Sequence, residues 1–231
     1  MTNLQRTGLE RPGRMSYNAD VTRNIHHYLT VDRDWGPLEI KQKGSRFIAF
    51  LSSAPDREAA EERIGALRDS HHDATHVCFA WRMTNGEETE HRYNDDGEPG
   101  GTAGLPIFNE VRRKDYVNVV LAVVRYFGGV KLGTGGLARA YGRAARLVME
   151  ASRPVRVILT EPAELTFPFD LTGEVMQVLR RLELKITGQE HTPAGTRLEV
   201  LVPRGRMTEL QMALLEAGGG RISLTAGPPE T

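Results

Sequence analysis

The sequence predicts an α+β protein with two domains, and two patterns carry this prediction. Residues 160–226 follow the order strand, helix, strand, strand, helix, strand within about seventy residues, which is the order of the ferredoxin-like unit. Upstream, residues 118–124 are apolar on both faces, as in a central strand, and lead through a glycine-rich turn into an amphipathic helix. Pro154 separates the two patterns, so we place the domain boundary at residues 155–160.

Local signals place the elements of the first domain. Asp56 and its neighbours supply helix-start chemistry before apolar residues at helical spacing. The Asn85-Gly86 pair is a strong hairpin signal between two strand-like segments. In order, we expect a strand at residues 47–51, a helix at 60–67, strands at 77–83 and 88–93, a helix at 105–111, a strand at 118–124 and a helix after the glycine-rich turn.

The second domain repeats strand-like and helical spacing in apolar residues. Its expected elements are a strand at residues 165–171, a helix at 175–182, strands around 186 and at 198–202, a helix at 207–214 and a strand at 222–224. Pro168 fits this plan poorly, because a proline inside a strand indicates an edge or a bulge. At the other end of the chain, residues 1–37 are polar without sustained periodicity, and we predict a loosely held extension there.

Charge is balanced over the chain but not along it. Thirty acidic and thirty basic residues cancel. Residues 112–153 hold nine lysines and arginines against two acids, whereas residues 56–110 hold thirteen acids against five arginines. Such asymmetry can steer a polyanion to one face of a neutral protein, unless neighbouring ion pairs cancel it.

Cysteine content and hydropathy predict the compartment. The single cysteine, Cys78, excludes an internal disulfide and fits a reducing environment. No apolar run approaches eighteen residues, and the N-terminus lacks a cationic segment followed by an apolar one. We therefore expect a cytoplasmic protein that does not contact a membrane.

The glycine-rich turn and the helix behind it form the main candidate site. A strand that leads through glycines into a helix can aim backbone amides at an anion, and Thr134 is placed to cap that helix. The alternative is that the glycines only permit positive φ angles and close packing. The candidate anion-binding or nucleic-acid-binding residues are Arg125, Gly128, Gly129, Lys131, Gly133, Thr134, Gly135, Gly136, Arg139, Arg143 and Arg146.

An acidic turn is the second candidate. Asp95, Asp96 and Glu98 could supply oxygen ligands to a cation such as magnesium, but Asp-Asp-Gly-Glu-Pro is also ordinary turn chemistry, and we expect no bound metal. Cys78 has no nucleophile signature, and the serines lack the glycine frame of a hydrolase elbow. The sequence therefore nominates no catalytic residue and no cofactor.

Three segments resemble the signature of the IMPACT/YigZ family. They are Asp-Asp-Gly-Glu-Pro with the following Gly-Thr-Ala-Gly-Leu-Pro, the run Val-Val-Arg-Tyr-Phe-Gly-Gly-Val-Lys-Leu-Gly-Thr-Gly-Gly-Leu, and the strand around residues 39–49. The resemblance covers residues 38–228. The family-motif loop comprises Asp95, Asp96, Gly97, Glu98, Pro99, Gly101, Thr102 and Gly104.

The resemblance implies the folds of both domains and a role in translation. It implies an N-terminal α/β domain at residues 38–156, like the second domain of a small-subunit ribosomal protein. It also implies a ferredoxin-like βαββαβ domain at residues 160–228, similar to elongation factor G domains. Eukaryotic relatives regulate translation through a partner-binding N-terminal module, for which residues 1–37 are too short. Bacterial members have been suspected of binding nucleic acid or ribosomes, and some carry a peptidase label that no residue pattern here supports.

The leading hypothesis is a cytosolic, non-enzymatic accessory of translation that binds structured RNA or the ribosome, with translation factors or other proteins as further partners. One rival is an enzyme acting on a phosphorylated small molecule, with residues 133–136 holding phosphate and Asp95, Asp96 or Glu98 as metal ligand or general base. The other rival is a protein adaptor that docks through the second domain. The oligomeric state is left open by the sequence.

Overall fold

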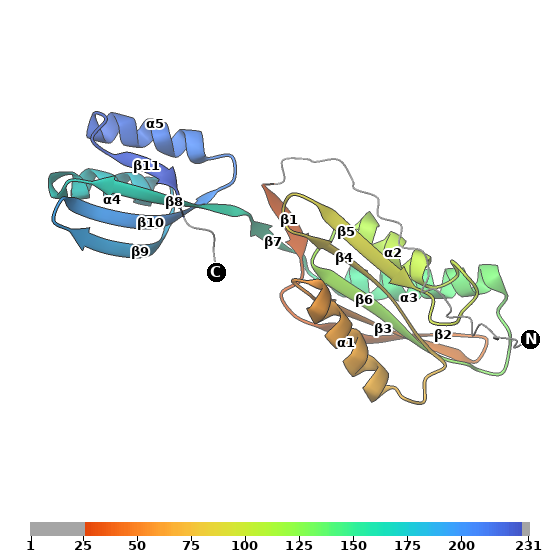
Figure 1. Cartoon of the computed structure of the whole chain (residues 1–231). Helices are drawn as coiled ribbons and strands as arrows, with labels where there is room; N and C mark the ends of the chain where they lie inside the picture. The colour runs from red at the N-terminus through yellow and green to blue at the C-terminus, as the bar shows by residue number, and fades with distance from the viewer. Residues whose placement is uncertain (1–25, 228–231) are drawn as a thin grey trace, which may run out of the picture.

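The computed structural model describes residues 26–227, which form two bodies with separate cores. Figure 1 shows them joined by a narrow extended connection, with the first body holding residues 26–158 and the second holding residues 159–227. We call these the first and second lobes. The chain is a mixed α+β protein, as the sequence predicts.

The first lobe is built on a five-stranded sheet in which every neighbouring pair is antiparallel. Its strand order is β2, β3, β6, β4, β5. The strands are β2 (Trp35–Gln42), β3 (Ser45–Ser53), β4 (His76–Thr84), β5 (Thr89–Asn94) and β6 (Val119–Tyr126). The hairpin predicted across Asn85-Gly86 is present, with Thr84 opposite Thr89.

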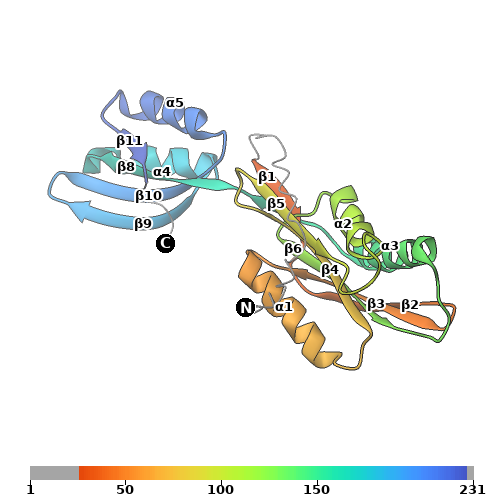
Figure 2. The same ribbon diagram turned by 45° about the vertical axis from the view of Figure 1, so that its right-hand side comes forward.

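Helices cover both faces of this sheet. Helix α1 (Arg57–Ser70) lies on one face, and α2 (Gly104–Arg113) and α3 (Thr134–Ala151) lie on the other (Figure 2). Two separate sets of buried apolar side chains fill these layers. The central strand β6 is therefore buried on both sides, which explains why its sequence is apolar without alternation.

A short pair of strands closes the first lobe at its junction with the second. Strand β1 (His27–Thr30) pairs antiparallel with β7 (Val155–Ile158), and Val31 after it is buried. Residues 26–37, which we predicted to belong to a loose extension, are thus part of the first lobe. The remainder of that predicted extension, residues 1–25, lies outside the described residues.

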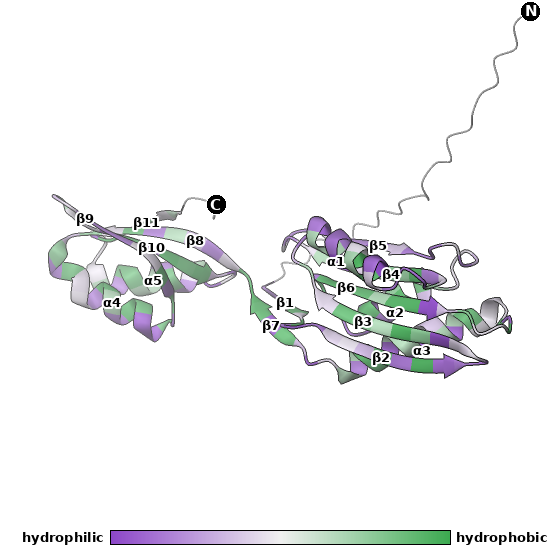
Figure 3. Ribbon diagram, turned by 90° about the horizontal axis from the view of Figure 1, so that it is seen from below, coloured by the Kyte–Doolittle hydropathy of each residue, from purple (hydrophilic) through white to green (hydrophobic). Residues whose placement is uncertain are grey.

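The second lobe has the predicted order of two βαβ halves. Its elements are β8 (Thr160–Phe167), a 3₁₀ turn (Phe169–Leu171), α4 (Thr172–Arg181), β9 (Lys185–Thr192), β10 (Gly195–Pro203), α5 (Met207–Gly218) and β11 (Ser223–Ala226). The sheet order is β11, β8, β10, β9, and both helices pack on one face of it (Figure 3).

One predicted strand is too long. We expected residues 165–171 to be extended, but β8 ends at Phe167 and residues 169–171 form the 3₁₀ turn. Pro168 precedes that turn, and its missing amide cannot continue the ladder with β10.

Direct contacts hold the two lobes at the junction. The Arg204 side chain donates from Nη1 to the Gly86 carbonyl at 2.8 Å, which links the second lobe to the β4–β5 turn. His26 Nδ1 lies 2.8 Å from the Arg204 carbonyl oxygen, and the Leu159 amide donates to the His26 carbonyl. The junction is therefore a hydrogen-bonded contact rather than a bare linker.

Among the described residues, no helix combines the length and the hydrophobicity needed to cross a bilayer.

Candidate functional site

Asp95 anchors the acidic loop, which is the segment that holds Asp95, Asp96 and Glu98. Its carboxylate accepts three backbone hydrogen bonds, from Gly101 at 2.8 Å and from Ala103 and Gly104 at 2.9 and 2.8 Å. The last two amides open helix α2, whose own N-cap residue, Ala103, has no side chain that can cap it. Asp95 therefore caps this helix from a distance, with its charge at the positive end of the helix dipole.

Asp96 fastens the same loop to the edge of the sheet. Its carboxylate accepts from the Val77 amide at 2.7 Å and from Arg68 at 3.0 Å. His76 Nδ1 lies 2.6 Å from the Asp96 carbonyl oxygen. Both aspartates are thus used to hold backbone, which is the turn chemistry that we weighed against a metal site.

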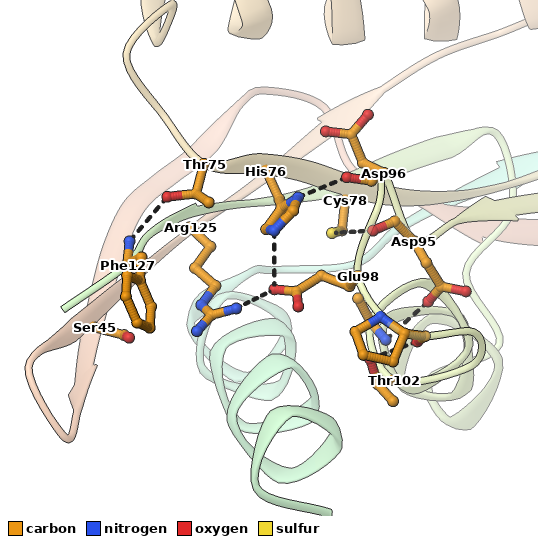
Figure 4. Close-up of polar contacts among 12 residues, drawn as sticks. Ser45, Thr75, His76, Cys78, Asp95, Asp96, Glu98, Thr102, Arg125 and Phe127 are labelled. Carbon is orange, nitrogen blue, oxygen red and sulfur yellow. Dashed lines mark hydrogen bonds and ion pairs between the residues drawn. The ribbon is translucent and has the colours of Figure 1, made fainter. Parts of the chain in front are cut away.

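Glu98 lies at the centre of a buried polar cluster (Figure 4). Its Oε1 accepts a short hydrogen bond from Arg125 and another at 2.8 Å from the Tyr141 hydroxyl, and it lies 3.8 Å from His76 Nε2. The side chains of Glu98 and Arg125 are only 3% and 6% exposed. Charges this deep in a protein persist only when paired, so each side chain holds the other in place.

Cys78 and Tyr141 complete this cluster. The Cys78 thiol donates to the Asp95 carbonyl at 3.1 Å and lies 3.4 Å from the Tyr141 hydroxyl. Burial strongly raises the pKa of Cys78 and of Tyr141. A buried thiol that stays protonated is a poor nucleophile, which agrees with the structural role expected for Cys78.

The family-motif loop is therefore a folding element. Thr102 bonds back to the Pro99 carbonyl from both its hydroxyl and its amide. Asp95, Asp96 and Glu98, which the enzyme rival would use as metal ligands or general base, each accept hydrogen bonds from protein donors in this structure. Within residues 26–227, no cluster of three or more histidine, cysteine or acidic side chains is arranged to hold a metal ion.

Two loops meet at the far end of the first lobe. The β2–β3 turn and the loop that follows β6 touch through Gly44 and Gly128, and a Cβ added to Gly128 would lie 1.9 Å from the Gly44 carbonyl carbon. The Gly128 amide also donates to the Ser45 hydroxyl at 3.1 Å. Glycine at position 128 is thus required by packing, which was the alternative we weighed for this run.

We call this end of the molecule the basic tip. It comprises the β2–β3 turn, the loop at residues 127–133 and the exposed side of the first turns of α3. It carries four exposed cations for which no ion pair is found with another described residue: Lys43, Lys131, Arg139 and Arg143. Figure 1 shows the turn and the loop side by side at the end away from the second lobe.

Two of the predicted cations do not belong to this surface. Arg125 is buried against Glu98, so it cannot meet a large anion. Arg146 donates to Glu110 of α2 at 2.8 and 3.2 Å. Burial alone would raise the pKa of Glu110, but hydrogen bonds from Arg146 and Arg113 outweigh it and hold that pKa below its ordinary value. Arg146 thus joins two helices instead of extending a cationic stripe.

The start of α3 differs from the predicted cap. Gly133 is the N-cap residue, with φ of +70°, and Thr134 is the first helical residue; no side chain caps the helix. Gly129 also has positive φ, and a Cβ at Gly135 would meet only the end of the flexible Arg139 side chain. The amides of the first helical turn therefore remain without a capping side chain beside Lys131 and Arg139.

Sequence reasoning missed three residues of the basic tip. Lys43 is far from the loop in the sequence, and the pairing of β3 with β6 brings its turn there. Phe127 and Val130 are 48% and 51% exposed, although apolar residues beside a buried strand are expected inside. Their place in or directly before the glycine run was the one available signal.

Comparisons with known proteins point to one family. Residues 43–149 match the model described as the Impact N-terminal domain. IMPACT family member YigZ of Escherichia coli is 32% identical over 186 residues, which are 80% of this chain and 90% of that protein.

A second relative and a solved structure extend the likeness. IMPACT family member YvyE of Bacillus subtilis is 41% identical over 120 residues, which are 52% of this chain and about half, 54%, of that protein. A crystal structure described as that of a hypothetical protein covers 89% of this chain and all of its own, with a TM-score of 0.63 and 28% identity. The likeness therefore spans both lobes.

Proposed function

Since the chain belongs to the IMPACT family, we propose that it is a cytoplasmic, translation-associated accessory protein that binds RNA or the ribosome through its basic tip. The role is one of binding and regulation, not of catalysis. The nominated partners are structured RNA or the ribosome, and further translation factors or other proteins.

The observation that carries this proposal is the set of four exposed cations on the basic tip. Cations that pair with carboxylates contribute little to the external field, whereas Lys43, Lys131, Arg139 and Arg143 have no such partner among the described residues. The uncapped amides of α3 point from the same place and add a partial positive charge. Together they present a rigid polycation to a phosphate backbone.

The rigidity of the tip supports the same proposal. Gly128 is wedged against Gly44, and its amide is bonded to Ser45. A fixed backbone loses little conformational freedom on binding, so more of the electrostatic attraction is retained as affinity. Contacts with phosphates orient a protein on RNA without reading its bases. We therefore expect weak sequence preference.

The fold is part of the proposal. The sheet order β11, β8, β10, β9 with two helices on one face supports a ferredoxin-like second lobe, similar to elongation factor G domains. We also propose that the first lobe has the fold of the second domain of a small-subunit ribosomal protein. Both likenesses are to proteins of the translation apparatus, and by themselves they are analogy only.

The experiment that tests the proposal measures binding against salt. Total RNA and purified ribosomes are titrated at about 50, 150 and 300 mM salt, with the parent and with a variant that replaces Lys43, Lys131, Arg139 and Arg143 by alanine. The slope of log K against log salt is negative, and each lost phosphate contact makes it shallower by roughly 0.7–0.9. We expect the slope to become shallower by about 3 in this variant.

A matched control removes the same charge elsewhere. It replaces Arg63, Arg92, Arg206 and Arg221, each of which pairs with a carboxylate, and it should bind like the parent. Equal weakening in both variants would assign binding to net charge and not to the basic tip. Absence of binding to RNA and ribosomes at the lowest salt would contradict the proposal and favour the protein adaptor or the enzyme acting on a phosphorylated small molecule.

A further inference from the structure

A large aromatic side chain stands exposed on the basic tip. Phe127 is 48% exposed directly after β6, and Val130 on the same loop is 51% exposed. Leaving a ring half in water forgoes much of the stabilisation that its burial would give. Lys43 and Lys131 are exposed on the same two touching loops. An apolar ring in a cationic setting is the composition of a nucleotide-binding surface.

The backbone under the ring is fixed on both sides. The Phe127 amide donates to the Thr75 hydroxyl at 3.0 Å, and the next amide, of Gly128, donates to Ser45 at 3.1 Å (Figure 4). Thr75 precedes β4 and Ser45 begins β3, so two strands of the sheet hold the position of the ring. A ring held in this way needs little further ordering to bind.

A buried cation supports the ring from within the lobe. The Arg125 guanidinium lies 5.6 Å from the Phe127 ring centroid and 5.5 Å from that of Phe47. Glu98 anchors Arg125, so the guanidinium cannot turn outward to the solvent. The acidic family-motif loop is thereby connected to the basic tip: Glu98 positions Arg125, and Arg125 positions the ring.

We infer that Phe127 is a stacking platform for an unpaired base, so that the basic tip takes single-stranded RNA in preference to duplex RNA. This inference rests on the proposed function and narrows its ligand. Bases in an A-form duplex are already stacked and paired, and their edges and faces are out of reach of such a ring. An unpaired base stacks on Phe127 while Lys43 and Lys131 contact the phosphates on either side of it.

The test compares two RNAs of equal length by fluorescence anisotropy. One is an oligouridine of about 12 nucleotides, within the usual site sizes for single strands, and the other is a duplex of the same length. The proteins are the parent, Phe127→Ala and Phe127→Tyr. A control, Phe169→Ala, removes a ring that is 54% exposed on the second lobe.

We expect the parent to bind the single strand more tightly than the duplex. Phe127→Ala should lose about 10-fold in affinity for the single strand and little for the duplex, with the salt slope unchanged. Phe127→Tyr, which keeps a stacking face, and Phe169→Ala should bind like the parent. Thermal unfolding of each variant verifies that the fold is retained.

The contrary outcomes are separable. If Phe127→Ala binds the single strand like the parent, or weakens both RNAs equally, the stacking role is wrong while salt-dependent binding leaves the proposed function standing. If the parent prefers the duplex, the ligand class is wrong. If the parent binds neither RNA at low salt, both the inference and the RNA-binding function fail.

Discussion

At the scale of single residues, the Glu98–Arg125 pair links folding to the candidate surface. Glu98 comes from the acidic loop, Arg125 from the end of β6 and Tyr141 from α3, so one carboxylate joins three segments behind the sheet. Arg125 Nε has no hydrogen-bond partner among the described residues, which leaves the pair dependent on the Glu98 contact. Burying two charges costs several kcal/mol each, and their mutual contact is the main interaction that offsets that cost, with the Tyr141 hydroxyl adding a hydrogen bond to Glu98.

Replacing Glu98 by alanine should therefore destabilise the protein strongly. The change leaves the Arg125 charge buried without its partner, and we expect the free energy of unfolding to fall by about 3–5 kcal/mol. Urea denaturation followed by circular dichroism measures it. Glu190→Ala is the control, since Glu190 is exposed and only 3.6 Å from Arg197 at the surface, and it should unfold like the parent. A loss below about 1 kcal/mol for Glu98→Ala, typical of surface pairs, would contradict this role.

At the scale of elements, the glycines between β6 and the first turn of α3 have different structural roles. Gly128 is a packing necessity, because the backbone of the β2–β3 turn occupies the space of a side chain. Gly133 turns the chain into the helix with a positive φ. Gly135 lies inside the first helical turn with only the Arg139 side chain near its missing Cβ. The three glycines therefore differ in role: one allows close packing of two loops, one is the N-cap of a helix, and one is a helical position with room for a methyl group.

Alanine substitutions at two of these glycines should change the free energy of unfolding in opposite directions. Gly128→Ala should lower the free energy of unfolding by roughly 2 kcal/mol or more, because the new methyl group must push the two loops apart. Gly135→Ala should raise it by about 0.5–1 kcal/mol, because alanine favours the helix. Thermal and urea unfolding give both values. Equal effects of the two substitutions would show that the loops do not touch as described.

At the scale of the whole molecule, the two lobes keep separate cores. Every buried residue of the second core lies between Ala163 and Leu214, and it includes no side chain from the first lobe. The contacts across the junction include the hydrogen bonds of Arg204, His26 and Leu159. Polar contacts of this kind fix the orientation of one lobe relative to the other, while each lobe is stabilised by the apolar side chains buried in its own core.

The second lobe should consequently fold alone. A fragment of residues 159–231 is expected to show a cooperative thermal transition by circular dichroism. For the first lobe, a fragment of residues 26–158 should be more stable than one of residues 38–156, because the shorter piece lacks β1 and the buried Val31. A non-cooperative 159–231 fragment, or equal stability of the two first-lobe fragments, would contradict this division.

Local pattern was enough to predict most elements. Residues 118–124 lack alternation because α1 and α3 bury both faces of β6, and Asp56 caps α1 as its position before the apolar spacing indicates, accepting from the Ala59 amide at 2.8 Å. Pro168 was recognised as a misfit in its strand and proved to end it. The family resemblance was also confirmed.

The site was harder to predict, because its residues meet only through tertiary structure. Nothing near Arg125 in the sequence reveals that Glu98, from another loop, buries it, or that Arg146 pairs with Glu110 of a neighbouring helix. A row of arginines in a helix predicts one continuous cationic surface when the ion-pair partners of the individual arginines are unknown. For the same reason Lys43 could not be assigned to the basic tip until β3 was known to pair with β6.

The pairing of β1 with β7 has a consequence for how the protein is made. The ribosome synthesises residues 27–30 early, but their ladder partners at residues 155–158 follow only after most of the first lobe. At about 5–20 residues per second, this interval is on the order of ten seconds. The first described strand of the nascent chain is therefore among the last to join its sheet, and the first lobe is closed by its own last strand, directly before the second lobe begins.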